Sequence, residues 1–95
     1  MKHCILVKWN TLVKDKRAIL PEINVIFGKL LSLQGISAVN IFENVVNRPN
    51  RYDLMICVEM DKEFLPIYDE SEPHHEWKEK FAKFVENKAI FDLEE

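Results

Sequence analysis

Residues 51–60, RYDLMICVEM, carry the strongest strand signal in the chain, because they form an apolar run between a turn-forming segment and a charged one. Side chains of a β-strand alternate between its two sides. Ile56 and Val58 share one side of this strand. Met55 and Cys57 lie on the other side, where a strand facing water carries polar residues. The segment therefore predicts a strand in a sheet that is covered on both faces.

Four strands and two main helices are predicted along the chain. Apolar residues from Ile19 to Leu33 recur in steps of three and four, which is the stripe of an amphipathic helix. Pro21 leaves two starts open for it, near Leu20 or near Asp15 with a bend, and Gly35 is placed to end it. The other predicted elements are strands at residues 2–9, 37–47, 51–60 and 88–94, a helical turn or brief helix at 61–69, and a helix from Pro73 to about Asn87.

The order strand, helix, strand, strand, helix, strand is that of the ferredoxin-like split βαβ fold. We therefore predict an α+β fold with a four-stranded antiparallel sheet, formed by a single domain over residues 1–95. The 95 residues are enough for one small core.

The two helices can cover only one face of this sheet. The other face also carries apolar side chains, which a second copy of the chain, packed sheet against sheet, would cover. We therefore expect a homodimer through this face, so that the fold becomes a dimeric α/β barrel. The residues that need this cover are Cys4, Leu6, Met55, Cys57, Phe91 and Leu93.

Composition excludes several kinds of partner. The net charge of −3 and the scattered lysines and arginines argue against nucleic acid and against a membrane surface. The apolar run near the N-terminus is too short for a signal peptide or a membrane span, so we expect a cytoplasmic protein. Cys4 and Cys57 lie in apolar runs without metal-ligand spacing, and we expect both to be reduced and buried.

Several segments together resemble a known family. They are KHCILVKW at residues 2–9, YDLMICVEM at 52–60, Tyr68 followed by SEPHHEW at 71–77, and FVENKAIFDLE at 84–94. In order and spacing they resemble the stress-responsive dimeric α/β-barrel (Dabb) domain, whose members are ferredoxin-like folds joined face to face. The resemblance spans residues 2 to 94.

Two histidines compete for the family's functional position. Family members carry a tyrosine, two residues and then His-Pro-x-His. Without a gap from Tyr68, His74 takes the place of the last histidine and Ser71 that of the first, whereas alignment on the proline selects His75. His74 also lies three residues before Trp77, on the predicted buried face of the helix. The spacing and the helix phase favour His74, with His75 as the alternative.

The resemblance implies roles for four polar residues. One plant member of the family is a polyketide cyclase, in which a histidine at the position of His74 acts as acid and base and a tyrosine at Tyr68 assists. His3 and Asp92 correspond to residues that border the same pocket. The cyclase's tyrosine on the first helix has no counterpart here, where Ile26 is the nearest residue. The expected apolar walls of the pocket are Ile5, Val7, Ile56, Trp77, Val85 and Ile90.

The residues themselves also allow purely structural interpretations. His74 can be a polar residue packed beside Trp77, and His3 with Asp92 can be a buried pair joining two strands. The acids and histidines at residues 69–75 complement a helix N-terminus, so we predict neither a metal nor a cofactor. Three functions remain: binding or acid/base conversion of a small apolar or aromatic molecule, a non-catalytic stress-associated structural oligomer, and, by fold analogy alone, a cofactor-free monooxygenase.

Overall fold

The computed structural model describes all 95 residues of the chain. Four strands, three α-helices and three short 3-10 segments follow one another. The strands are β1 (Lys2–Trp9), β2 (Ile36–Glu43), β3 (Leu54–Met60) and β4 (Val85–Leu93). The helices are α1 (Leu20–Gly28), α2 (Leu65–Glu70) and α3 (Glu72–Phe81), and the 3-10 segments are Lys29–Ser32, Lys62–Phe64 and Ala82–Phe84. None of these helices is long and apolar enough to cross a membrane.

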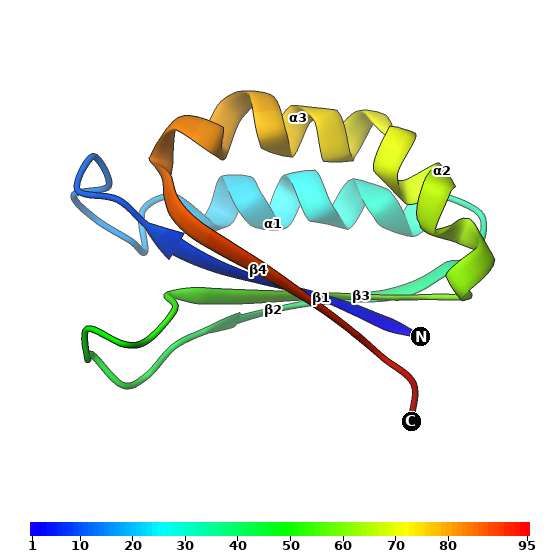
Figure 1. Cartoon of the computed structure of the whole chain (residues 1–95). Coiled ribbons are helices and arrows are strands. Elements are labelled where there is room, and N and C mark those ends of the chain that lie inside the picture. The colour runs from blue at the N-terminus through cyan, green and yellow to red at the C-terminus, as the bar shows by residue number, and fades with distance from the viewer.

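The strands form one antiparallel sheet in the order β2-β3-β1-β4. The first strand pairs with both β3 and β4, so it lies inside the sheet, and the last strand forms an edge (Figure 1). Helix α1 connects β1 to β2, while α2 and α3 connect β3 to β4. This arrangement is the predicted ferredoxin-like fold.

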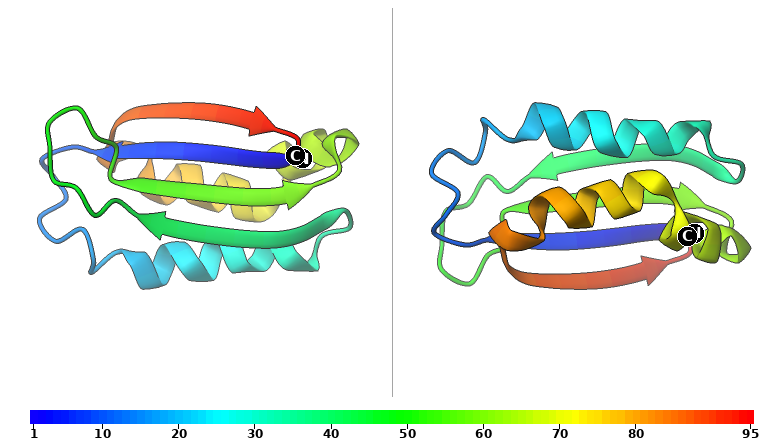
Figure 2. Two further views of the ribbon diagram at one scale, coloured as in Figure 1. Left: turned by 90° about the horizontal axis from the view of Figure 1, so that it is seen from below. Right: turned by 90° about the horizontal axis from the view of Figure 1, so that it is seen from above.

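The helices cover one face of the sheet unevenly. Helix α3 crosses above β1 and β3, and β4 stays uncovered at its side (Figure 2). Ile90 of β4 is 53% exposed for this reason, although its cross-strand partner Ile5 is only 3% exposed. The helix side of β4 therefore borders open space beside α3.

The core fills the layer between the helices and the inner strands. Trp77 of α3 lies at its centre, with its ring centroid 5.2 Å from the rings of both Phe27 and Phe81. Val7 and Ile56 contribute from the sheet and are fully buried. Burial of these large side chains supplies the main driving force for the fold.

The first helix takes the later of its two possible starts. Helix α1 begins at Leu20 with Pro21 in its first turn, where a missing amide hydrogen costs nothing. Asp15 instead accepts hydrogen bonds from the amides of Arg17 and Ala18 in the turn before it. The α-helical part ends at Gly28, and Lys29–Ser32 continue as a 3-10 turn.

The two strand boundaries on either side of the loop after β2 differ from the prediction. The second strand ends at Glu43 rather than at residue 47, and the third begins at Leu54 rather than at residue 51. Between them, the Asp53 carboxylate accepts a hydrogen bond from the amide of Trp9 at 2.8 Å and pairs with Lys16. These side-chain bonds anchor Asp53, the last residue of the loop at 44–53, to β1 and to the segment before α1.

The predicted end of the second long helix, near Asn87, is wrong. Helix α3 ends at Phe81, and the last strand begins at Val85 rather than at residue 88. The amide of Asn10 donates to the carbonyl of Phe84 at 2.8 Å, and Val85 pairs with Trp9. Pairing with β1 thus draws the β-branched Val85 into the sheet, although the apolar spacing continued the helix pattern.

The outer face of the sheet is apolar but is not exposed throughout. Phe91 and Phe42 are 64% and 50% exposed, whereas Leu6 is half-buried. Cys4 and Cys57 were expected to need cover, yet neighbouring side chains already bury them, to 6% and 8% exposure. The large uncovered apolar surface of this face therefore comes mainly from its aromatic residues.

Candidate functional site

Tyr68 is the buried residue of α2, and its ring packs against two imidazole rings. Its ring centroid is 5.1 Å from that of His3 and 4.7 Å from that of His74. The side chain is 1% exposed, and its hydroxyl has no hydrogen-bond partner in the protein. Since buried polar groups in proteins are nearly always paired, this hydroxyl is the most unusual polar atom of the molecule.

The junction between α2 and α3 holds Tyr68 and His74 in place. Ser71 caps α3, because its hydroxyl oxygen accepts a hydrogen bond from the backbone amide of His74 at 3.3 Å. The same hydroxyl donates to the carbonyl of Tyr68 at 2.7 Å. Ser71 is 8% exposed, so a single buried side chain ties both residues to one local geometry.

His3 and Asp92 form a hydrogen-bonded pair between neighbouring strands. They face each other in the register of β1 and β4, and Nδ1 of His3 lies 2.5 Å from Oδ1 of Asp92. The His3 side chain is 6% exposed and that of Asp92 41% exposed. The structure therefore brings together four of the predicted polar residues, His3, Tyr68, His74 and Asp92.

The environment sets the protonation states of Tyr68 and His74. Burial, with the Asp69 carboxylate nearby, raises the pKa of Tyr68 far above its usual range, so the hydroxyl stays protonated. Burial lowers the pKa of His74, and Lys78 and Lys88 act in the same direction. Nδ1 of His74 lies 2.8 Å from the carbonyl oxygen of Asp69. Since a carbonyl only accepts, Nδ1 carries the proton and neutral His74 keeps its lone pair on Nε2.

The predicted wall residues fall into two groups. Ile5, Val7, Ile56 and Trp77 are at most 4% exposed and belong to the core, so they do not line a large open cavity. At the edge of the core, a hollow of about 180 Å³ lies between α3 and β4, and we call it the α3–β4 hollow. Its lining residues are Trp77, Lys78, Ala82, Val85 and Lys88.

We call His3, Tyr68, His74 and Asp92 the tyrosine cluster. Two of its members, His74 and Asp92, lie on α3 and β4, the same two elements that border the hollow. Ile90 and Asp92 follow Lys88 at the two-residue spacing that keeps strand side chains on one face. On α3, His74 and Lys78 are four residues apart and so share a side of the helix. Val85 and Ile90, predicted as walls, therefore lie along the uncovered side of β4 rather than inside a closed pocket.

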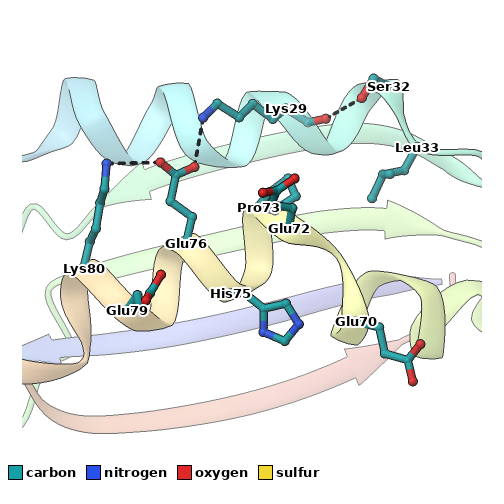
Figure 3. A pocket seen from close by; sticks show the side chains of 10 residues that line it. All are labelled: Lys29, Ser32, Leu33, Glu70, Glu72, Pro73, His75, Glu76, Glu79 and Lys80. Atoms are coloured by element: carbon teal, nitrogen blue, oxygen red, sulfur yellow. Dashed lines mark hydrogen bonds and ion pairs between the residues drawn. The ribbon is translucent and has the colours of Figure 1, made fainter.

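His75 lies elsewhere. It is exposed and lines a wide polar groove between the end of α1 and the start of α3, together with Pro73 (Figure 3). Glu76 bridges Lys29 and Lys80 in this groove, at 2.9 and 3.1 Å. Exposed ion pairs of this kind contribute little to stability. The groove shares none of its lining residues with the tyrosine cluster.

No group of three or more His, Cys, Asp or Glu side chains is placed to hold a metal ion. Ser71 is the site residue that sequence reasoning undervalued, since it entered only as a substitute for a family histidine. Its signal was present: a serine three residues before His74 and two residues before Pro73 is a typical helix start.

No protein-family model and no curated protein sequence matches this chain. Solved structures match it in fold. A dimeric ferredoxin-like protein of unknown function from Thermobifida fusca has a TM-score of 0.79 and 16% identity, over 97% of this chain and 89% of that one. A dabb family protein with a ferredoxin-like fold from Mesorhizobium loti has a TM-score of 0.73 and 12% identity, over 99% and 94%. A hydroxynitrile lyase from Passiflora edulis has a TM-score of 0.72 and 11% identity, over 95% and 87%.

These matches define the class of protein by its fold. The chain has the ferredoxin-like fold shared by these structures, over nearly its whole length. The resemblance seen in the sequence agrees with this result at the level of the fold, because one of the matching structures is a dabb family protein.

Proposed function

We propose that this chain is a member of the stress-responsive dimeric α/β-barrel family that binds a small apolar or aromatic molecule beside Tyr68 and His74. The buried, unpartnered hydroxyl of Tyr68 is the observation that carries the proposal. A buried donor without a partner costs about 1–3 kcal/mol, which a ligand oxygen would offset by accepting its hydrogen bond.

The same cluster is suited to moving a proton. Neutral His74 offers the Nε2 lone pair as a base, because Nδ1–H is held by the Asp69 carbonyl. Tyr68 keeps its proton and so donates to an oxygen on which negative charge develops. His3, oriented by Asp92, also packs against the Tyr68 ring.

The α3–β4 hollow is the proposed place for the apolar part of the ligand. Trp77 and Val85 supply apolar surface there, and Ile90 extends it along β4. A hydroxynitrile lyase among the structures of this fold supports the view that the fold can carry chemistry on small molecules. Its 11% identity transfers no substrate to this chain.

We also propose that the chain forms a homodimer through the outer face of its sheet. Exposed Phe42 and Phe91 on this face favour a covering partner. The matching proteins from Thermobifida fusca and Bacteroides fragilis are described as dimeric. Their ferredoxin-like fold is the one that this chain shares.

The binding proposal is tested with a panel of small aromatic and polyketide-like compounds, screened by ligand-observed NMR. For any compound that binds, Tyr68→Phe and His74→Ala should each weaken binding by about tenfold, the effect of one lost hydrogen bond. His75→Ala is the matched control and should leave the affinity unchanged. Loss of binding in His75→Ala alone would place the ligand in the other groove.

A non-catalytic structural oligomer is the competing function, and one observation favours it. Ile5, Val7, Ile56 and Trp77 are packed in the core, which leaves only the small hollow at its edge. If no compound of the panel binds and the variants Tyr68→Phe and His74→Ala keep the wild-type oligomeric state, this function is preferred.

A further inference from the structure

The two cysteines of the chain are 53 positions apart in sequence and face each other on two neighbouring strands. Cys4 of β1 and Cys57 of β3 are directly paired in the antiparallel register. Their Sγ atoms are 2.8 Å apart, and both thiols are free. The sequence placed both in strands but gave no sign that the register would bring them together.

The backbone at this position suits a covalent bond. The amide of Met60 donates to the carbonyl of Met1 at 3.0 Å, so Met1 and Met60 form a hydrogen-bonded pair. Hydrogen-bonded and non-hydrogen-bonded pairs alternate along an antiparallel ladder, which makes Cys4 and Cys57 a non-hydrogen-bonded pair. Such pairs have Cα atoms about 4.5 Å apart, which lies within the range that a disulfide spans.

The surroundings keep the pair as thiols until an oxidant reaches it. Both residues are more than nine-tenths buried in the single chain. Burial, and then the hydrogen bond with Cys4, raise the pKa of Cys57 to about 12. Because the thiolate is the reactive form, this thiol reacts slowly at neutral pH.

We propose that Cys4 and Cys57 are a site of reversible oxidation to a disulfide that links β1 to β3. A peroxide is the oxidant. One thiol attacks the peroxide oxygen, forms a sulfenic acid and releases water or an alcohol. The second thiol then displaces the hydroxyl group as a second water molecule, and the S–S bond forms. Two thiols are thus oxidised by two electrons while one peroxide is reduced.

The test is hydrogen peroxide treatment of the folded protein, followed by intact mass and non-reducing peptide mapping. We expect a loss of two hydrogen atoms and a linked peptide pair containing Cys4 and Cys57, reversed by dithiothreitol. Once one cysteine is oxidised, the ratio of the linked pair to separately oxidised cysteines should be at least about tenfold higher in the folded chain than in the urea-unfolded chain, because the sheet holds the second thiol beside the sulfenic acid. Cys4→Ala and Cys57→Ala are matched controls that cannot lose the two hydrogens.

Cys4 and Cys57 lie on the outer face of the sheet, which the proposed dimer covers. The reaction is therefore run in parallel on Met55→Lys, a variant designed to prevent the dimer and keep this face free. Formation of the linked pair in either protein supports the site. Separate oxygen additions at each cysteine, disulfides between chains, or an equal proportion of the linked pair in the folded and unfolded chains would overturn it. So would unreacted thiols in both proteins when an exposed cysteine peptide is fully oxidised.

Discussion

The hydroxyl oxygen of Tyr68 is the atom on which the proposed function mainly depends. This hydroxyl is buried without a partner, while the ring on which it sits packs between His3 and His74. The ring therefore contributes to packing, and the hydroxyl adds a desolvation cost to the folded state. Residues that cost stability in this way are found at functional sites more often than elsewhere.

Removal of the Tyr68 hydroxyl should separate stability from binding. Because the hydroxyl is unpaired, Tyr68→Phe should leave the free energy of unfolding unchanged or raise it by about 1 kcal/mol. Urea denaturation at one protein concentration measures the change. A loss of more than about 1 kcal/mol would mean that the hydroxyl has a hydrogen-bond partner in the folded protein.

His74 should make the protein less stable in mild acid. Burial lowers its folded-state pKa, so as the pH falls through its unfolded-state value of about 6.5, the unfolded chain takes up the proton first. The free energy of unfolding should therefore decrease between pH 7.5 and pH 5. His74→Gln should show a smaller decrease, and exposed His75→Gln the wild-type decrease. Equal slopes in all three proteins would contradict the lowered pKa.

At the scale of elements, the sequence predicts the strands and helices better than it predicts where they end and how they pack. The sequence predicted the order of elements, the sheet and the face that each strand buries, because these follow from apolar periodicity. It placed the end of α3 wrongly, since Phe84 and Val85 continue the helical spacing while the pairing with β1 is not visible locally. The uncovered side of β4 was missed for a similar reason: the position of a helix over a sheet depends on packing of the whole core.

Ser71 should act as a positioning residue for both site residues. Ser71→Ala removes the cap of α3 and the bond to Tyr68, and should lower the free energy of unfolding by about 1 kcal/mol. Ser71→Thr keeps the hydroxyl and should recover most of this loss. NMR spectra of the imidazoles should also change in Ser71→Ala, because His74 loses its fixed place. An unchanged His74 signal would leave Ser71 with only a capping role.

Substitution of the two glycines of the chain by alanine should change the stability in opposite directions. Gly35 has a positive φ of 88°, and an added Cβ would collide with the Phe64 ring. Gly35→Ala should therefore cost at least about 2 kcal/mol of folding free energy. Gly28 has a helical φ of −60° and open space around it, so Gly28→Ala should stabilise by up to about 1 kcal/mol. Thermal melts of both variants test the pair, and similar shifts would contradict this account of the turn.

At the scale of the whole molecule, the sheet has one covered face and one apolar face without a partner in the chain. The sequence predicted this division from Met55 and Cys57, and also that the cysteines are reduced. It did not predict that the cysteines would be buried before any dimer forms. That result depends on the register of β1 and β3, which residue types alone do not determine.

Assembly should depend on the outer face and not on exposed apolar residues in general. Met55→Lys places a charge on this face, between Leu6 and Phe42 of the neighbouring strands, and should convert the dimer to monomer, because a buried unpaired charge costs several kcal/mol. Val25→Lys is the matched control, since Val25 is 62% exposed on α1. Sedimentation velocity at micromolar concentration measures both. A wild-type protein that sediments as a monomer would remove the proposed dimer.

The pairing of His3 with Asp92 has a consequence for biosynthesis. The two residues are separated by 89 positions, and each terminal strand supplies one of them. During translation, therefore, the chain has no complete site until β4 has left the ribosome and docked beside β1. A partly made chain can bury Ile5 and Ile56 but cannot orient His3, so any activity that depends on this pair appears only when synthesis of the domain is finished.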